Sequence, residues 1–265
     1  MSRALDIANH FNLEGRAVSA ESYGGGHIND TFLLKTDAGI SYILQRINTF
    51  VFKDTQGLME NVVAVTDFLQ DKIKQAGGDP LRETLNIIPT ESGESFYREG
   101  EECWRVYTFI AGAVDIPTCE NEEQFYASAC AFGRFQKLLA DYPADTLHET
   151  IPNFHNTKSR YGDFEAAVAA DACGRAACVE KEIAFVRARK EFASTLVDMQ
   201  EKGQLPLRVT HNDTQLNNVL FDGESGQPLA VVDLDTVMPG LSINDFGDSI
   251  RFGATYAAED EPDLD

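Results

Sequence analysis

One stretch, from Arg208 to Gly240, constrains the fold of this chain more than any other. It places His211, Asp213 and Asn218 close together, and Asp233 follows at the end of the apolar run L-A-V-V. Between them, V-L-F, the turn-forming segment D-G-E-S-G-Q-P and the apolar run predict two strands joined by a turn. Because the second strand of a hairpin returns beside the first, the acid at its end is expected to lie beside Asn218. The stretch therefore predicts that two carboxylates and an amide converge.

The return strand is expected to run from Leu229 through Asp235. Successive side chains of a strand point to opposite faces. Val231, Asp233 and Asp235 are then expected on one face of the hairpin.

The spacing H-x-D-x-x-x-x-N is typical of the catalytic loop of kinases. In that loop an Asp receives or orients the acceptor hydroxyl, while other oxygen ligands face Mg²⁺. We therefore predict Asp213 as the catalytic carboxylate and Asn218 and Asp233 as metal ligands. His211 is expected to hold the loop by hydrogen bonding. Each residue alone is more ordinary as a turn cap or a solvated side chain, and only the joint pattern favours phosphoryl transfer.

A second acid, Asp245, begins the triplet D-F-G that protein kinases use for a metal ligand. It follows Asp213 by thirty-two residues, and Pro239 and Gly240 interrupt the chain between them. This spacing disfavours Asp245 as the ligand. We expect it to cap a helix that starts at Phe246, or to hydrogen-bond the catalytic loop from behind.

The N-terminal part predicts a small antiparallel sheet, with strands over 17–23, 31–36 and 40–46. The first connection contains Gly24, Gly25 and Gly26, which allow close backbone approach and can present amide groups to phosphate oxygens. His27 and Asn29 follow and can reach a phosphate or a sugar. An ordinary flexible hairpin is the alternative, because the run matches neither the Walker nor the dinucleotide-binding pattern.

Kinases usually carry a lysine on the third strand of this sheet, and the chain lacks it. One alignment puts Gln45 at that position, and a shift by one residue puts Arg46 there. A one-residue shift reverses the face of a strand, so the sequence leaves both open. The need for a cation favours Arg46. Glu60 on the next helix is a possible partner, although an exposed helix glutamate is the more ordinary interpretation.

The strand C-W-R-V-Y-T-F-I ends at Ile110, and the chain is expected to pass there from a first lobe, 1–110, to a second, 111–265. The backbone of Tyr107, Phe109 and Ile110 is predicted to meet the adenine edge of a nucleotide. Trp104 is expected in the core. Helical spacing of apolar residues predicts helices over 125–139, 161–172 and 179–200. His155 is expected on a turn, and a place in a sugar site is the alternative.

Taken together, R-V-T-H-N-D-T-Q-L-N-N, D-L-D-T-V-M-P-G and D-F-G-D-S-I-R-F-G resemble the aminoglycoside phosphotransferase and choline kinase superfamily, most closely its N-acetylhexosamine 1-kinase branch. G-H-I-N, Y-I-L-Q-R-I-N and W-R-V-Y-T-F-I extend the resemblance over nearly the whole chain. It implies an α+β, protein-kinase-like fold, with a small antiparallel β-sheet lobe that includes a helix and a larger, mainly helical lobe. Similar kinases continue with further helices, so it also implies that the C-terminal part is missing.

The resemblance also implies an activity: ATP-dependent phosphorylation of the anomeric hydroxyl of N-acetylglucosamine or N-acetylgalactosamine. ATP would be the co-substrate and Mg²⁺ the cofactor. Two alternatives remain. The protein is a choline, homoserine or aminoglycoside kinase, or it is a nucleotide-binding protein without activity, since the usual lysine is missing.

The composition limits the classes of binding partner that are expected. The formal net charge of −21 disfavours nucleic acids and anionic lipid. The sequence has no apolar run of membrane-spanning length, and its five cysteines form no C-x-x-C pair and are predicted to be reduced core thiols. We therefore expect a cytoplasmic enzyme that acts on small molecules. The oligomeric state is left open.

Overall fold

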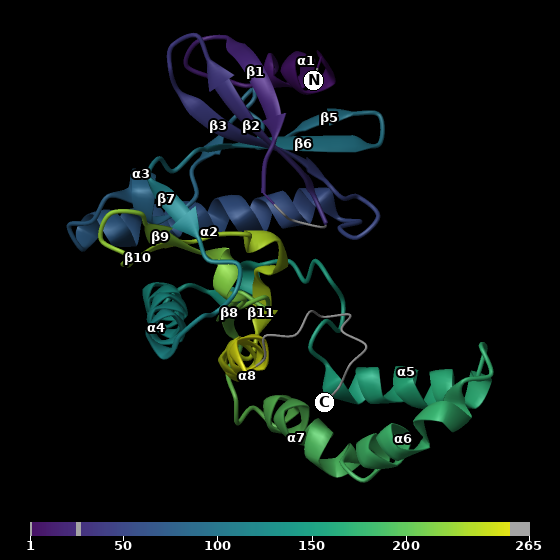
Figure 1. Cartoon of the computed structure of the whole chain (residues 1–265). Coiled ribbons are helices and arrows are strands. Elements are labelled where there is room, and N and C mark those ends of the chain that lie inside the picture. Colours follow the sequence, from purple (N-terminus) through teal and green to yellow (C-terminus); the bar gives the residue numbers. More distant parts are fainter. Residues whose placement is uncertain (1, 25–27, 255–265) are drawn as a thin grey trace.

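The computed structural model describes residues 2–24 and 28–254. Their elements form an α+β fold with two lobes, an antiparallel sheet with its helices and a mainly helical part (Figure 1). The fold class predicted from the sequence is therefore confirmed.

The first lobe contains a six-stranded antiparallel sheet in the order β1-β2-β3-β6-β4, with β5 paired to β6. Helix α1 precedes the sheet, and α2 and α3 connect β3 to β4. The bounds are α1 Ser2–Ala8, β1 Ala17–Ser22, β2 Asp30–Thr36, β3 Ser41–Ile47, α2 Thr55–Gln75, α3 Pro80–Glu83, β4 Ile87–Ile88, β5 Tyr97–Glu99 and β6 Glu102–Thr108.

Helix α2 lies below the sheet and packs against both lobes (Figure 1). The Asp54 side chain caps it by accepting a hydrogen bond from the Gly57 N–H at 2.9 Å. Val62 and Leu69 are buried on one face of the helix. They belong to the same hydrophobic cluster as Phe132 of the second lobe, so one core joins the two lobes.

The second lobe combines two small sheets with helices. Strands β10, β9 and β7 form one sheet, and β11 pairs with β8. Helices α5, α6 and α7 lie together at the end of the molecule that is farthest from the first lobe (Figure 1). The bounds are β7 Ala113–Asp115, α4 Glu122–Leu138, η1 Ala144–Thr146, α5 Thr157–Ala170, η2 Ala176–Val179, α6 Glu180–Arg187, α7 Lys190–Glu201, β8 Arg208–Thr210, η3 Leu216–Asn218, β9 Val219–Asp222, β10 Pro228–Val231, η4 Leu234–Thr236, β11 Met238–Gly240 and α8 Ser242–Gly253.

Three local predictions were wrong. The helix expected over 179–200 is divided at Ala188 and Arg189, although neither glycine nor proline stands there. The return strand ends at Val231 instead of continuing through Asp235. Of the five cysteines, only Cys103 is buried. The expected strands over 17–23, 31–36 and 40–46 match β1, β2 and β3 to within one residue at each end.

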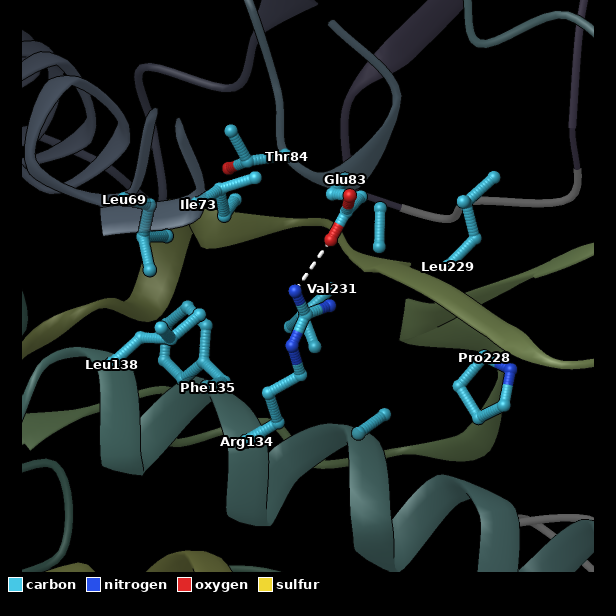
Figure 2. A pocket seen from close by; sticks show the side chains of 12 residues that line it. Leu69, Ile73, Glu83, Thr84, Arg134, Phe135, Leu138, Pro228, Leu229 and Val231 are labelled. Atoms are coloured by element: carbon cyan, nitrogen blue, oxygen red, sulfur yellow. Dashed lines mark hydrogen bonds and ion pairs between the residues drawn. The ribbon is translucent and has the colours of Figure 1, made fainter. Parts of the chain in front are cut away.

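A cavity of about 40 Å³ lies where α2, α4 and β10 meet (Figure 2). Leu69, Phe135 and Val231 line it, and Arg134 forms an ion pair with Glu83 beside it. The volume is close to that of one water molecule. We attribute it to imperfect packing between the lobes. Among the helices that the structure describes, none has the length and apolarity needed to cross a membrane.

Candidate active site

The loop after β8 is held from behind by Asp245. Its carboxylate accepts hydrogen bonds from the backbone N–H of His211 at 3.0 Å and of Asn212 at 2.8 Å. Asn212 has a left-handed backbone, with φ 65°, and the two bonds satisfy amides that this turn would otherwise bury unpaired. Helix α8 begins at Ser242, so Asp245 does not cap a helix starting at Phe246. The other expectation, support of the loop from behind, is confirmed.

His211 is fully buried and joins two parts of the site. Its Nε2 lies 2.9 Å from the Val232 carbonyl oxygen, and its Nδ1 lies 3.3 Å from the Asp213 backbone nitrogen. Because Nδ1 accepts from that N–H, the ring carries its proton on Nε2 and donates it to the carbonyl. The rings of Phe132 and Phe135 pack edge-on against it. The geometry suits a residue that holds the loop in place.

Asp213 and Asn218 lie together, as the spacing predicts. The Asn218 amide nitrogen donates to the Asp213 backbone oxygen at 2.9 Å and to the Asp213 Oδ2 at 3.1 Å. This orientation leaves the Asn218 Oδ1 as the atom able to face a cation. The Val232 N–H donates to the Asn218 carbonyl at 2.9 Å, so the hairpin does return beside Asn218.

Asp233 follows directly and adopts the left-handed conformation, with φ 56° and ψ 59°. This turn ends the strand, which is why the predicted alternation of Asp233 and Asp235 on one strand face does not occur. Surrounding protein removes water from the Asp233 carboxylate, and this desolvation, followed by the charge of Asp235, raises its pKa to about 7. Asp213 adds to the rise and Arg105 opposes it. The residue is exposed, so solvent weakens the effect of its neighbours.

The side-chain oxygen atoms of Asn218 and Asp233 suit a hard divalent cation. Mg²⁺ in proteins takes carboxylate and amide oxygens and keeps several waters, and a cation would offset the charges that Asp235 and Asp213 place near Asp233. No group of three or more His, Cys, Asp or Glu side chains within the described ranges has the geometry of a metal site. The candidate therefore depends on an amide, Asn218, beside Asp233.

The predicted phosphate loop lies only in part within the described residues. Gly24 has φ +75°, a conformation that glycine adopts easily. Gly25, Gly26 and His27 lie outside the described residues. Asn29 faces the second lobe: its amide nitrogen donates to the Asp235 Oδ2 at 2.7 Å, and its Oδ1 accepts from the Asn48 N–H at 2.9 Å.

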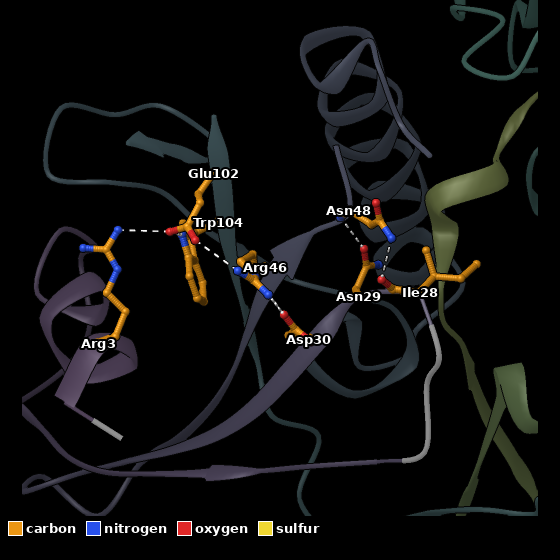
Figure 3. A network of polar contacts seen from close by, with 8 residues as sticks. All are labelled: Arg3, Ile28, Asn29, Asp30, Arg46, Asn48, Glu102 and Trp104. Carbon is orange, nitrogen blue, oxygen red and sulfur yellow. Dashed lines mark hydrogen bonds and ion pairs between the residues drawn. The ribbon is translucent and has the colours of Figure 1, made fainter. Parts of the chain in front are cut away.

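Arg46 does not face this site. It forms ion pairs with Asp30 and, at 3.0 Å, with Glu102, and Figure 3 shows these residues in a group separate from Asn29. Gln45, one position earlier, points to the opposite face of β3. There its Oε1 accepts two hydrogen bonds from Arg105, at 3.0 and 2.8 Å. The preference for Arg46 is therefore wrong, because strand alternation puts it on the far side of the sheet.

Other first-lobe predictions had mixed outcomes. Glu60 is an exposed helix glutamate, which confirms the more ordinary interpretation; it does not pair with Arg46, and its Oε2 lies 2.7 Å from the His148 Nε2. Trp104 is buried, as expected.

The segment expected to meet adenine leads out of β6. The side chains of Tyr107 and Ile110 are buried, so only their backbone can take part in recognition. The Phe109 ring packs edge-on against Tyr23, with ring centroids 5.9 Å apart, next to the glycine-rich turn. The segment therefore lies beside Tyr23, the residue before Gly24.

A cavity of about 500 Å³ adjoins the catalytic loop between α7, β11 and the segment 149–157. His155, expected on a turn, lines it, and its Nε2 lies 3.3 Å from the Asn212 carbonyl oxygen. Glu149 is the one carboxylate among the lining residues, and the other polar ones carry amide, hydroxyl or imidazole groups. The cavity is large enough for a sugar-sized molecule.

Two residues of the site were missed. Arg105 is 1% exposed and forms an ion pair with Asp235, 4% exposed, at 2.5 Å. An arginine inside the strand C-W-R-V-Y was a usable signal, because a cation among buried apolar residues requires a partner. The partner could not be identified, since it lies far along the chain.

The chain belongs to the phosphotransferase enzyme family, whose model matches residues 19–264. Solved structures support the same fold. An amicoumacin kinase, hAmiN, in complex with AMP-PNP, Ca²⁺ and Ami has a TM-score of 0.61 at 15% identity, covering 98% of this chain and 72% of the other. An aminoglycoside phosphotransferase from Alicyclobacillus acidocaldarius has a TM-score of 0.61 at 13% identity, covering 93% and 70%. A spectinomycin phosphotransferase in complex with ADP and spectinomycin has a TM-score of 0.54 at 13% identity, covering 97% and 80%. These matches confirm the kinase-like fold predicted from the sequence.

Proposed function

We propose that this protein is an ATP-dependent kinase that phosphorylates the anomeric hydroxyl of an N-acetylhexosamine, giving the sugar 1-phosphate and ADP. The observation that carries the proposal is the hydrogen bond from Asn218 to Asp213 beside the turn that carries Asp233, where Val232 donates to the Asn218 carbonyl, in a chain of the phosphotransferase enzyme family. The resemblance of the sequence to N-acetylhexosamine 1-kinases supports the choice of acceptor.

In this mechanism Asp213 orients the acceptor hydroxyl and takes its proton. Its Oδ2 accepts from Asn218, so Oδ1 is the oxygen left to accept from the hydroxyl. A bound Mg²⁺, held by Asn218 and Asp233, would neutralise phosphate charge. His211 and Asp245 keep the loop in place while the proton moves.

The nucleotide is proposed to lie between the lobes, whose boundary we place at residues 110 and 111. Its phosphates would lie under the turn at 24–26, with Asn29 at the end of that turn. The backbone of Tyr107, Phe109 and Ile110 would contact the adenine. Gln45 lies on the face of β3 that is directed to this region and acts through Arg105.

The cavity beside the catalytic loop supports a neutral acceptor. An aminoglycoside carries several ammonium groups, which several carboxylates would be needed to balance. Among its described lining residues the cavity offers only Glu149, together with amides and hydroxyls that suit hydroxyl and acetamido groups.

An aminoglycoside-type kinase is the second candidate. Two observations favour it: the formal charge of −21, which suits a cationic acceptor, and the fold shared with an aminoglycoside phosphotransferase and a spectinomycin phosphotransferase.

An acceptor screen separates these functions. ADP release is measured with N-acetylglucosamine, N-acetylgalactosamine, choline, homoserine and a kanamycin-type amine. We expect turnover only with an N-acetylhexosamine. Turnover only with the amine selects the second candidate, and Mg-ATP binding without transfer to any acceptor identifies a nucleotide-binding protein without activity.

The variant Asp213→Asn tests the catalytic assignment. We expect kcat to fall by about 10³-fold, while AMP-PNP binding stays within about twofold of wild type. The same change at Asp141, an exposed residue paired with Lys72, is the control and should leave kcat unchanged. Activity of Asp213→Asn within about tenfold of wild type would reject the assignment.

A further inference from the structure

We propose that Arg105 is the positioning cation of this site, which through Asp235 holds the turn that carries Asp233. The inference rests on the proposed function, because it assigns Arg105 to the support of a metal and nucleotide site. Its role is to position other groups, which differs from the phosphate pairing of the strand lysine that the chain lacks.

Because Arg105 is buried, its charge needs a partner that compensates for the loss of water. Removing a guanidinium from water is costly unless it is paired and hydrogen-bonded. Arg105 lies in the middle of β6, 1% exposed, above the ring of Tyr107 at 5.0 Å. Its ion pair with Asp235 at 2.5 Å crosses from the sheet of the first lobe to the η4 turn of the second. The pair is therefore a buried electrostatic link between the lobes.

The contacts of the guanidinium decide how it acts. Nε and Nη2 donate to the Gln45 Oε1, at 3.0 and 2.8 Å. Nη1 is paired with Asp235 and lies 3.8 Å from the sulfur of Met59. Each of the three nitrogens already has a protein partner, and the side chain is closed to solvent. Arg105 is thus suited to orienting other groups and not to touching a phosphate.

Asp235 connects Arg105 to both sides of the site. Along the chain it stands two residues after Asp233, whose left-handed backbone is part of the same turn. Across the site its Oδ2 accepts from the Asn29 amide at 2.7 Å, and Asn29 in turn accepts from the Asn48 N–H. One chain of contacts therefore runs from Arg105 through the acidic turn to the segment that follows the glycine-rich loop. Loss of the cation should misplace the acidic turn relative to that segment.

The test separates positioning from simple stability. Removing one partner of a buried pair leaves an uncompensated charge, whereas replacing both by apolar residues is often tolerated. The variants are Arg105→Met, Asp235→Leu and the double variant, and Arg46→Met on the neighbouring strand is the control. The measurements are the urea midpoint, the kcat, the apparent Mg²⁺ constant at saturating ATP and calorimetric binding of AMP-PNP with and without Mg²⁺.

We expect both single variants to lose stability and the double variant to recover its urea midpoint. Even so, the kcat of the double variant should be about 10- to 100-fold lower than that of wild type, and its apparent Mg²⁺ constant about 10- to 100-fold higher. Arg46→Met should stay within about twofold of wild type. Recovery of kcat and the Mg²⁺ constant together with stability would overturn the proposal.

A further variant keeps the test decisive if the double variant does not fold. Arg105→Lys retains the charge but loses the fork on Gln45, and it should raise the apparent Mg²⁺ constant by about tenfold. A constant equal to that of wild type would overturn the proposal. If the wild-type protein does not bind Mg²⁺ and AMP-PNP, the proposed function is refuted. If the wild-type protein binds both and the Arg105 variants behave like it, only the role of Arg105 is refuted.

Discussion

Asp245→Asn is expected to cost stability without removing the metal site. The Asp245 carboxylate accepts from the His211 N–H at 3.0 Å, from the Asn212 N–H at 2.8 Å and from the Gln136 amide at 3.0 Å, and it is 2% exposed. An asparagine has one accepting oxygen, so its amide nitrogen would face one of the two backbone donors.

The magnitude follows from these contacts. The substitution loses a hydrogen bond to a charged group, worth about 1.5–3 kcal/mol, and leaves a buried N–H unpaired, at about 1–3 kcal/mol. We expect a loss of about 3 kcal/mol in the free energy of unfolding, or about 6–12 °C in Tm. The kcat should fall by about tenfold or more, because the displaced loop carries the catalytic carboxylate.

Urea unfolding followed by the fluorescence of Trp104, the single tryptophan and a buried one, measures the loss. Asp141→Asn at the surface should change stability by less than about 1 kcal/mol. Asp233→Asn should show the opposite pattern: a raised Mg²⁺ requirement with no loss of stability, because it removes a charge whose pKa is already raised by its surroundings. If Asp245→Asn kept full stability and instead raised the Mg²⁺ requirement, Asp245 would be the metal ligand that D-F-G spells, and the reasoning would be refuted.

Two further predictions concern packing. Asn61→Ala should destabilise the protein by about 3 kcal/mol in urea unfolding, because the buried Asn61 amide donates to two backbone carbonyls and accepts from a backbone N–H. The same change at the exposed Asn9 should cost less than about 0.5 kcal/mol. Equal effects at the two positions would contradict this account. In α8, Gly247→Ala should stabilise the protein by about 0.5–1 kcal/mol of helix propensity and so raise Tm slightly, because no described atom beyond its chain neighbours and its own helix backbone lies within 4 Å of the new methyl group. Gly253→Ala should lower Tm instead, since its methyl group would collide with the ring of Phe125, and a gain at both positions would disprove the clash.

The parts of the site that lie close together in the sequence could be predicted. His211, Asp213 and Asn218 share one loop, and a short hairpin returns Asp233 to them, so residue spacing alone carried the information. The conformation at Asp233 could not be predicted, because an Asp gives no sign of whether it continues a strand or turns into the left-handed region. The break between α6 and α7 has no local signal either, since the segment R-A-R-K contains no residue that disfavours a helix.

The parts that depend on strand register were harder. The choice between Gln45 and Arg46 depends on which face of β3 is directed to the second lobe, and a shift of one residue reverses the answer. Arg105 becomes meaningful only when β6 is paired with β3, where it stands opposite Gln45. Its counterion, Asp235, then comes from the other lobe. Such contacts are set by tertiary structure and leave only an indirect trace in the sequence, a charged residue among apolar ones.

The hydrophobic cluster that α2 shares with the second lobe has a consequence for how the chain can be divided. A fragment that ended at residue 110 would keep the compact cluster around α1 and the sheet, yet it would expose the apolar face of α2, including Val62, Val65 and Ile73. Exposed apolar surface of this kind favours aggregation. The two lobes are therefore expected to form one cooperative unit when the protein unfolds, and independent expression of either half should yield insoluble material.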